Sequence, residues 1–401
     1  MAQLKDHREL GKVLDLFSFH EEAPGAIFWH HKGYVIYKTL IQSLRDRLLK
    51  ENYQEISSPV MVKSQLFKQS GHWDFYHENM FNLAIEKESY SLKPMNCPGA
   101  ALIYSTKPKS YQDLPIRYSD FGVLHRNELS GVLGGAFRVR QFTIDDAHHF
   151  VRPDQIQEEI KNLLLLVVDF YKSLNFKPEF YLSTKPEKAM GDVKLWETAE
   201  KDLKKALEES GVKFGIKEKD GAFYGPKIDI HIKDSQDRDW QLATIQLDFQ
   251  IPERMKLEYI DSDGRPKRPV IIHRAVLGSV ERFIGILTEH YQGSFPLWLA
   301  PIQVAVLPVS EKHNDQSKHI AEELKKHNIR VELDDENKTL GAKIRESTLQ
   351  KVPYMVIMGD KELEGKDNMQ ISIRTHEGKD LGLLPLTQFL KMVKEQIEQY
   401  A

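Results

Sequence analysis

The chain has 401 residues, of which 41% are hydrophobic and 29% are charged, and its formal net charge is −3. This length exceeds one ordinary domain and the composition is that of a water-soluble globular enzyme, so we expect two or three domains. The near balance of charges excludes a strongly basic domain, and any RNA contact must use local patches. The single cysteine, Cys97, excludes an internal disulfide and fits a reducing compartment. Because no apolar run can span a membrane and the charged start lacks a signal peptide, we expect a cytoplasmic protein.

The first part of the chain predicts a strand-rich sheet with inserted helices. Residues 34–37 have the composition of a strand, and a helix with Leu40, Leu44 and Leu48 on one face follows them. Residues 56–62 predict an edge strand or a bulge, because Pro59 removes a ladder hydrogen bond. Helices are predicted over 156–168, 196–206 and 276–287, and further strands are predicted at 117–124, 137–142, 147–151, 179–182, 227–232 and 244–249. This is an α+β pattern.

The pattern changes near Pro301 to alternating strands and helices. Strands are predicted at 303–307, 329–333, 354–358 and 369–373, and helices at 317–327, 342–350 and 386–399. Such alternation is typical of a separate α/β domain with a largely parallel sheet. We therefore predict two domains: residues 1–298 form an antiparallel sheet with flanking helices, and residues 299–401 form a smaller α/β domain.

Residues 121–140 predict a hairpin with a glycine-rich loop and several charged side chains. Arg126 and Glu128 are two residues apart and therefore share one face of a strand, where they suit a phosphate and a purine amine. A surface ion pair is the simpler interpretation of the hairpin taken alone. The cluster Asp145, Asp146, His148 and His149 follows; it indicates metal binding or acid–base chemistry, or else a solvated strand end.

Two further segments carry candidate side chains. Cys97 lies in a rigid turn and His273 ends an apolar strand, where a core histidine is the simpler interpretation. No spacing rule links these residues with His148, so the spacing alone is weak evidence for zinc. Residues 275–282 place small residues at a helix start and Arg282 in its first turns, which suits an anionic ligand or ordinary helix packing.

Several strings resemble a known family. Residues 125–128 (H-R-N-E) resemble motif 2 of the class II aminoacyl-tRNA synthetases, residues 278–282 resemble motif 3, and Pro59 resembles the motif 1 proline at the dimer interface. More specific are S-G-H-W at 70–73, K-P-M-N-C-P-G at 93–99, F-T-I-D-D-A-H at 142–148, G-A-F-Y-G-P-K at 221–227 and I-H-R-A at 272–275. Together they resemble the threonyl-tRNA synthetase family over nearly the whole chain. The last hundred or so residues resemble the anticodon-binding domain of subclass IIa.

The resemblance implies that Cys97, His148 and His273 bind Zn2+ and leave a fourth position open. In the family, threonine fills this position with its amino group and its hydroxyl. A site that must bind a hydroxyl rejects valine, whereas an apolar pocket alone would reject valine only weakly. Asp146 would accept the hydroxyl proton. The other threonine contacts would be Met95, Arg126, Tyr224, Gln246 and Ser279.

The resemblance also implies a site for ATP with Mg2+. Arg126 would bind the threonine carboxylate and the α-phosphate and stabilise the charge that develops there. Glu128 would read the adenine amine and Phe142 would stack on its ring. The remaining nucleotide contacts would be Arg138, Gln241, Thr244 and Arg282. The implied catalytic residues are Arg126, Arg282, Lys227 and His72, the last helping to deprotonate the terminal ribose of the tRNA.

In the second domain, the resemblance implies anticodon contacts with tRNA(Thr) through Asn337, Lys351, Glu362 and Arg374. Lys351 stands in place of an arginine and lacks its planar fork. Motif 1 implies a homodimer. Many family members carry N-terminal domains, including an editing domain that removes serine, and we expect this protein to act without an editing domain. Because serine differs from threonine by one methyl, we expect serine to be misacylated, with discrimination of about 10–200-fold.

Some residues depart from the usual family pattern and can alter the shape of the pocket: Ala100, Gln141, Ile144, Leu242 and Ala243. Three alternative functions fit the sequence less well. A histidine or proline enzyme of the same subclass is disfavoured by the Cys-His-His set and Asp146. A catalytically silent, synthetase-like regulator that binds tRNA or an amino acid is disfavoured by the retained Arg126, Glu128 and Arg282. A zinc hydrolase is disfavoured because no H-E-x-x-H motif occurs.

Overall fold

The computed structural model describes residues 4–363 and 369–398. Its contacts divide the chain into two compact units. One unit comprises residues 19–27 and 44–285, and the other comprises residues 1–18, 28–43 and 286–401. The domain boundary between residues 298 and 299 stays a prediction.

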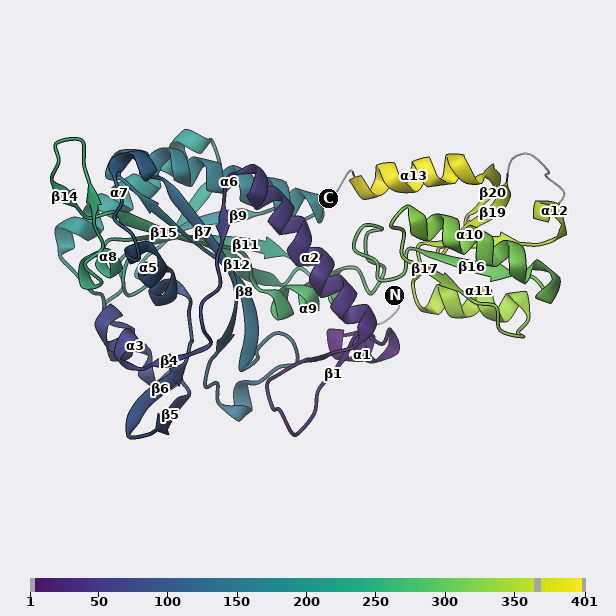
Figure 1. Cartoon of the computed structure of the whole chain (residues 1–401), viewed down its shortest axis with the longest axis horizontal. Coiled ribbons are helices and arrows are strands. Elements are labelled where there is room, and N and C mark those ends of the chain that lie inside the picture. Colours follow the sequence, from purple (N-terminus) through teal and green to yellow (C-terminus); the bar gives the residue numbers. More distant parts are fainter. Residues whose placement is uncertain (1–3, 364–368, 399–401) are drawn as a thin grey trace. The chain divides into compact units, whose positions relative to one another are not determined.

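The unit around residues 44–285 is built on an eight-stranded sheet (Figure 1). In spatial order its strands are β10 (Phe214–Lys217), β9 (Glu179–Ser183), β11 (Lys227–Lys233), β12 (Asp239–Asp248), β15 (Val270–Ser279), β8 (Gln141–Val151), β7 (Ile116–His125) and β3 (Gln54–Glu55). The pairs from β9 to β7 are antiparallel, and parallel pairing occurs at the two edges, β10 with β9 and β3 with β7. This confirms the predicted antiparallel sheet.

Helices flank this sheet. Helix α6 (Ile156–Ser173) packs against β12 and β15, and α7 (Val193–Ser210) packs against β9. The hydroxyl of Tyr171 on α6 donates a 2.7 Å hydrogen bond to the carbonyl of Val276. Gly211 ends α7 with φ +73°, as predicted, because glycine adopts the left-handed conformation without a Cβ clash. The other helices wholly within this unit are α3 (Gln65–Ser70), α4 (His72–Tyr76), α5 (Cys97–Ser105) and α8 (Gln250–Arg254). Helices α2 (His31–Lys50) and α9 (Val280–His290) have residues in both units, and α1 (His7–Val13) belongs to the other unit.

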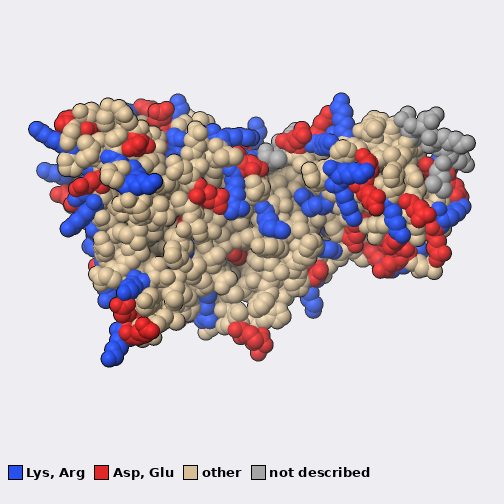
Figure 2. Space-filling view, viewed as in Figure 1, with Lys and Arg blue, Asp and Glu red and all other residues tan. Residues whose placement is uncertain are grey.

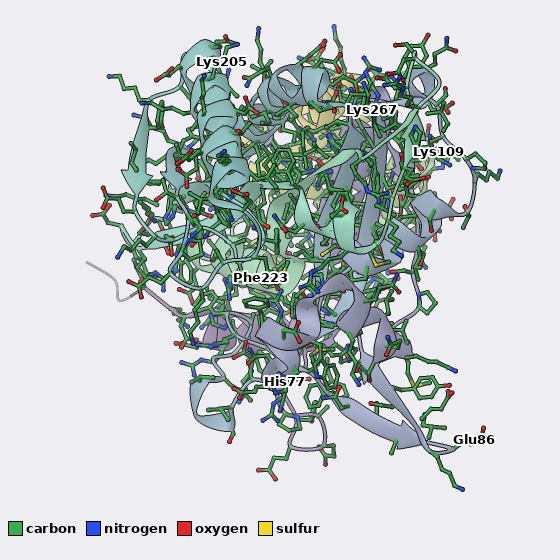
Figure 3. The ribbon with its side chains drawn as sticks, turned by 90° about the vertical axis from the view of Figure 1, so that its left-hand side faces the viewer. His77, Glu86, Lys109, Lys205, Phe223 and Lys267 are labelled. Atoms are coloured by element: carbon green, nitrogen blue, oxygen red, sulfur yellow. The ribbon has the colours of Figure 1, made fainter. Side chains whose placement is uncertain are left out.

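A small three-stranded sheet accompanies the large one. Its order is β4 (Met61–Lys63), β6 (Glu88–Leu92) and β5 (Asn82–Ile85). Strands β5 and β6 are joined by Glu86 and Lys87, which both have positive φ, as the type I′ turn of a two-residue hairpin requires. The tip of this hairpin, with Glu86, projects from the body of the unit (Figures 1 and 3).

The unit that contains residues 286–401 has a five-stranded sheet. Its order is β17 (Val331–Leu333), β16 (Val304–Pro308), β18 (Tyr354–Met358), β19 (Gln370–Thr375) and β20 (Asp380–Pro385). The first three strands are parallel, but β19 and β20 are antiparallel, so the predicted largely parallel sheet is only partly correct. The helices of this part are α10 (Asn314–Lys326), α11 (Leu340–Leu349), α12 (Asp360–Leu363) and α13 (Leu386–Glu398). The predicted end of α13 at residue 399 lies outside the described residues.

The strand predicted at residues 34–37 is wrong, because these residues lie in α2 (His31–Lys50). Ile36 begins the same fully buried stripe that Leu40 and Leu44 continue, and this helical spacing outweighs the strand preference of the local composition. The helix predicted over 276–287 begins only at Val280. Strand β15 continues to Ser279, so Val276 is a strand residue.

The predicted strands at 137–142 and 147–151 are a single strand, β8, which begins at Gln141. Its ten-residue pairing with β7 confirms the hairpin, but Arg126 and Glu128 lie in the connecting loop and not on a strand. In the segment predicted around Pro59, β4 begins only at Met61. Proline and its restricted neighbour account for this gap.

Charged side chains of both signs occur on the visible face of the protein, with a broad area free of them between (Figure 2). This distribution agrees with the 56 basic and 59 acidic residues of the sequence. Among the helices of the described residues, none has both the length and the apolarity of a membrane span.

Candidate metal and substrate site

Two rows of side chains cross one face of the large sheet. Directly paired residues on neighbouring strands point to the same side, and side chains two apart along a strand share a face. From β9 to β7, the first row contains Ser183, Lys227, Gln246, His273, His148 and Tyr118. The adjacent row contains Tyr181, Asp229, Thr244, Ala275, Asp146 and Asp120. Strand pairing thus gathers on one face residues that are far apart in the sequence.

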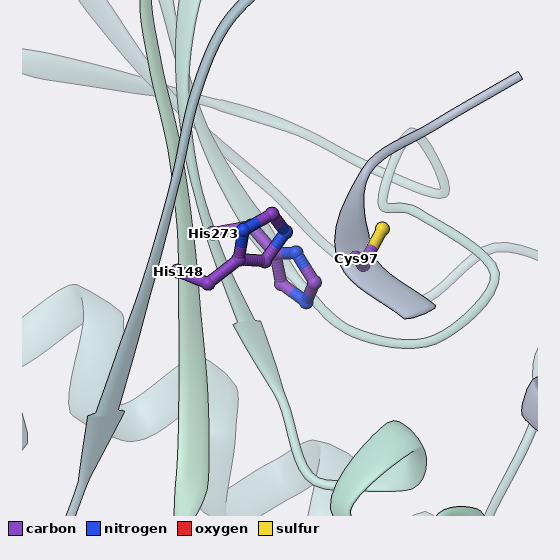
Figure 4. A group of neighbouring side chains, drawn as sticks. All are labelled: Cys97, His148 and His273. Atoms are coloured by element: carbon purple, nitrogen blue, oxygen red, sulfur yellow. The ribbon is translucent and has the colours of Figure 1, made fainter. Parts of the chain in front are cut away.

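Cys97, His148 and His273 come together on this face (Figure 4). One candidate ligand atom from each lies within 4.8 Å of the other two, and all three residues are buried. The two histidines are cross-strand partners on β8 and β15, with ring centroids 4.9 Å apart. Cys97 is the first residue of α5. The fold therefore brings together three residues whose spacing in the sequence gives no sign that they are neighbours.

The chemistry of these residues fits a zinc ion. His148 is fully buried, and neither of its ring nitrogens has a hydrogen-bond partner among the described residues. Burial lowers the pKa of His148 well below its usual value, which favours the neutral, ligating ring. Nε2 of His273 lies 2.9 Å from a buried carboxylate oxygen of Asp248, the kind of partner that fixes the tautomer of a ligating histidine. A Cys-His-His set leaves one tetrahedral position for a substrate.

The predicted threonine contacts surround this group. Oδ2 of Asp146 lies 3.9 Å from Nε2 of His148 and accepts a 3.3 Å hydrogen bond from Asn96. Burial raises the pKa of Asp146 to about 6. Tyr224 donates its hydroxyl proton to Gln246, and its ring centroid lies 5.1 Å from that of His273. Met95 packs against the apolar cluster that contains Cys97.

His72 also lies close to the Cys97 thiol. Its Nε2 lies 3.9 Å from Sγ of Cys97 and its Nδ1 lies 2.8 Å from the hydroxyl oxygen of Ser70. Burial lowers the pKa of His72 to about 3, so its ring is neutral. Its ring meets the edge of Phe223, which is labelled in Figure 3 and stacks on the half-exposed ring of Phe75 at 4.7 Å. A ribose contact at His72 therefore requires one of its present contacts to be exchanged.

Two arginines form the positive part of the site. The guanidinium of Arg126 lies 5.0 Å from the ring centroid of Phe142, and its Nε donates to the carbonyl of Pro94 at 3.4 Å. Arg282 on α9 donates to the carbonyl of Phe137 at 2.8 Å. Burial, and secondarily the charge of Arg126, lowers the pKa of Arg282. A half-buried cation next to another cation is suited to a polyanionic ligand.

Glu128 and Arg138 form the ion pair that the hairpin alone suggested, with an N–O distance of 2.9 Å. Ser279 donates its hydroxyl proton to Glu281 at 3.1 Å. The predicted nucleotide contact Gln241 donates to Asp229 at 2.6 Å, and Thr244 accepts from Gln246 at 3.1 Å.

Sequence reasoning missed four buried carboxyl or amide groups at this site: Asn96, Asp229, Asp248 and Glu281. Strand alternation could have indicated two of them, because Asp229 is two residues from Lys227 and Asp248 is two residues from Gln246. The carboxylate of Glu281 accepts the backbone N–H of Thr143 at 2.9 and 3.0 Å, and burial raises the pKa of Glu281 to about 7. A contact between residues so distant in the sequence has no local signal.

The predicted anticodon residues lie in the other unit. Asn337 lines a pocket of about 410 Å³ together with Ser310, Lys312, Asp335 and Lys343. Lys351 follows α11 with φ +56°, and Arg374 lies on β19. Glu362 is buried, and its oxygens accept hydrogen bonds from the N–H of Gly359 and the hydroxyl of Ser372. A base contact at Glu362 would therefore replace an internal hydrogen bond.

The chain matches two protein families. The tRNA synthetase class II core domain (G, H, P, S and T) matches residues 81–291, and the anticodon binding domain matches residues 303–396. A threonine–tRNA ligase from Caldanaerobacter subterraneus subsp. tengcongensis is 51% identical over 99% of this chain and 61% of its own length. The chain thus spans about three-fifths of the length of this curated relative.

Solved structures agree with these matches. The RNA binding domain of threonyl-tRNA synthetase from Cryptosporidium parvum Iowa II is 41% identical and has a TM-score of 0.94, with 98% of both chains covered. Prolyl-tRNA synthetase from Giardia lamblia, in complex with prolyl-adenylate, has a TM-score of 0.77 with 100% of this chain and 81% of that chain covered, but at 18% identity it shows the fold alone. The family model covers more than half of the chain and confirms the class II resemblance. The chain therefore belongs to the threonyl-tRNA synthetase family of the class II tRNA synthetases.

Proposed function

We propose that the protein is a threonine–tRNA ligase, which activates threonine with ATP and transfers it to the 3′ end of tRNA(Thr). The observation that carries this proposal is the buried group Cys97, His148 and His273 beside Asp146. A class II core alone does not select an amino acid. A metal-ligating group next to a carboxylate selects one that carries an amino group and a hydroxyl together.

Cys97, His148 and His273 would hold Zn2+, which supplies a Lewis-acid position that an amino group and a hydroxyl can share. Asp146 would accept the threonine hydroxyl proton, since its carboxyl stays largely ionised at neutral pH with a pKa of about 6. Tyr224 and Gln246, which are hydrogen-bonded to each other, would form a wall of the pocket together with Met95. Valine has the same shape but would leave Oδ1 of Asp146 without a donor, which costs more than the loss of one apolar contact.

In the activation step, a threonine carboxylate oxygen would attack the α-phosphorus of ATP, the bond to the β-phosphate would break, and pyrophosphate would leave with Mg2+. Arg126 and Arg282 would stabilise the negative charge on the reacting phosphate. Phe142 would stack on the adenine. The other nucleotide contacts would be Glu128, Arg138, Gln241 and Thr244, with Ser279 at the amino acid.

In the transfer step, a hydroxyl of the terminal ribose would attack the adenylate carbonyl, and AMP would leave. His72 is neutral in this structure and would help to accept the proton after exchanging a present contact. Lys227 lies in the same row as Gln246 and His273 and would place a positive charge close to the leaving phosphate.

We further propose that the domain of residues 299–401 binds the anticodon through Asn337, Lys351, Glu362 and Arg374. Surface charge of both signs supports contacts through local patches instead of a uniformly basic face (Figure 2). A homodimer and a cytoplasmic location complete the proposal.

Amino-acid-dependent ATP–pyrophosphate exchange tests this proposal, with threonine, serine and valine, before and after chelation of zinc. Strong exchange with threonine, weaker exchange with serine, none with valine, and loss on chelation that added Zn2+ reverses are expected. Folded, zinc-loaded protein that shows no exchange with any amino acid would instead favour the catalytically silent regulator. Binding of tRNA(Thr) to that protein would then identify its ligand.

A further inference from the structure

A buried carboxylate, Asp229, lies at the centre of hydrogen bonds from three strands. Its side chain is fully buried on β11. Oδ2 accepts the hydroxyl proton of Ser183 at 2.6 Å and lies 2.8 Å from Nζ of Lys227. Oδ1 accepts from the side-chain amide of Gln241 at 2.6 Å. One carboxylate thus holds both Lys227 and Gln241, two residues of the proposed reaction.

A β-bulge makes this arrangement possible. The pairing of β11 with β12 shifts between Ile230 and His231. Strict alternation would place Gln241 on the face opposite to Thr244, but the extra residue in the bulge returns it to the same face. The amide of Gln241 therefore reaches Asp229, and both lie on the face that carries the candidate metal group.

Lys227 has a second, weaker carboxylate neighbour. Its Nζ lies 3.7 Å from Asp220, whose side chain is 53% exposed, whereas the side chain of Lys227 itself is only 13% exposed. A lysine ammonium sits on a flexible stem and has no fixed donor direction, so its position depends on the acceptor that holds it. Without Asp229, Asp220 would remain as the charged partner and would draw the ammonium toward solvent.

We propose that Asp229 is a positioning residue that fixes the ammonium of Lys227 and the amide of Gln241 toward the reacting centre. It acts through these two side chains and not by touching the substrate. The inference rests on the proposed function, because it assigns a role within that reaction. A misplacement of about 1 Å at a group of this kind costs on the order of 100-fold in rate.

The test is Asp229→Asn in the full 401-residue chain, measured by threonine-dependent pyrophosphate exchange. Asparagine has the same shape, but it has one acceptor oxygen and one donor nitrogen, so it cannot satisfy three donors. We expect kcat to fall about 10–100-fold, with the KM values for threonine and ATP changed by less than about threefold. Melting temperature and zinc content should match those of the unaltered protein, and a merely structural role would not produce this split.

Asp220→Asn is the matched control, because it removes the other carboxylate next to Lys227 from an exposed position. We expect a change of less than about twofold. A double-mutant cycle with Lys227→Met then identifies the route. If Asp229 acts through Lys227, the combined loss is clearly smaller than the product of the two single losses.

Two results overturn the inference: an Asp229→Asn protein as active as Asp220→Asn, or single losses that multiply without coupling. If Asp229→Asn does not fold, Ser183→Ala removes one hydrogen bond to the same oxygen and leaves the carboxylate in place. A loss of about 2–10-fold in kcat at unchanged KM then supports positioning, and full activity contradicts it. Absence of threonine-dependent exchange in the unaltered protein would contradict the proposed function itself, which is a separate outcome.

Discussion

Replacement of Asp146 by asparagine should weaken the selection of threonine over valine. Asn96 donates to Oδ2 of Asp146, which leaves Oδ1 as the acceptor that we propose for the threonine hydroxyl. A hydrogen bond to a charged group contributes about 1.5–3 kcal/mol, which corresponds to about 10–150-fold in kcat/KM. Valine has no hydroxyl and cannot make this hydrogen bond, so the substitution should change the kcat/KM for valine little. The preference for threonine should therefore fall by about the same factor.

The assay is kcat/KM for pyrophosphate exchange with threonine and with valine at equal protein and saturating ATP. Asp113→Asn, a substitution on the exposed turn before β7, is the control and should leave both values unchanged. Zinc content is measured in every sample, since Asp146 lies 3.9 Å from His148. Equal losses with threonine and valine at full zinc occupancy would refute the reasoning, because they would show that Asp146 acts on the reaction in general and not on the hydroxyl.

Three other perturbations have definite expected outcomes. Burial raises the pKa of Glu281 from 4.5 to about 7, so between these pH values the folded protein keeps a proton that the unfolded chain releases. The free energy of unfolding should therefore fall by about 3 kcal/mol as the pH rises from 4.5 to 7. Glu281→Gln should reduce this pH dependence of the free energy of unfolding, measured by urea denaturation. Lys343→Met leaves the carbonyls of Pro308 and Asp334 without their lysine donor and should destabilise its unit by about 2–6 kcal/mol in calorimetry, with threonine-dependent exchange unchanged. Serine exchange should have a kcat/KM about 10–200-fold below that of threonine, and rejection as complete as that of valine would contradict a site that reads the hydroxyl.

The sequence predicted most of the fold because local patterns decided it. Helix α6 follows from its apolar stripe, the end of α7 follows from Gly211, and the parallel strands β16 and β18 follow from short apolar runs between helices. The errors occurred where packing opposed local preference. Residues 34–37 have a strand-like composition, but Ile36 shares a buried helical stripe with Leu40 and Leu44. The helix predicted over 276–287 starts too early, because the apolar residues after Val270 suit either a strand or a helix.

The candidate site was predicted through resemblance, and its geometry could not be read from the sequence. Cys97, His148 and His273 are brought together by the pairing of β8 with β15 and by the start of α5, none of which leaves a spacing signal. The hydrogen bond from Gln241 to Asp229 depends on a one-residue bulge, which reverses the face assigned by simple alternation. Long-range register is therefore the information that the residues alone did not supply.

The cluster at residues 145–149 is really two clusters, because neighbouring strand residues point to opposite faces. Asp146 and His148 face the candidate metal, together with His273. Their neighbours Asp145, His149 and Arg274 point to the other side of the sheet. Nη1 of Arg274 lies 3.0 Å from the carboxylate of Asp145, and the ring of His149 contacts Glu159 and Tyr53 at 2.8 Å each.

This reverse face holds β8 against β15 directly behind the two histidines. The carboxylate of Asp145 on β8 also accepts the backbone N–H groups of Val276 and Leu277 on β15, at 2.7 and 2.8 Å. These bonds are fully buried, so removal of either charged partner would leave an uncompensated charge and cost about 3–5 kcal/mol. His148 and His273 need no hydrogen bond between them to stay close, because the strands that carry them are fixed from behind. The ring nitrogens of His148 have no hydrogen-bond partner among the described residues and are available to a ligand, whereas Nε2 of His273 is held by Asp248. Because of strand alternation, the residues that stabilise the pairing and the residues that can bind a ligand lie on opposite faces of the sheet.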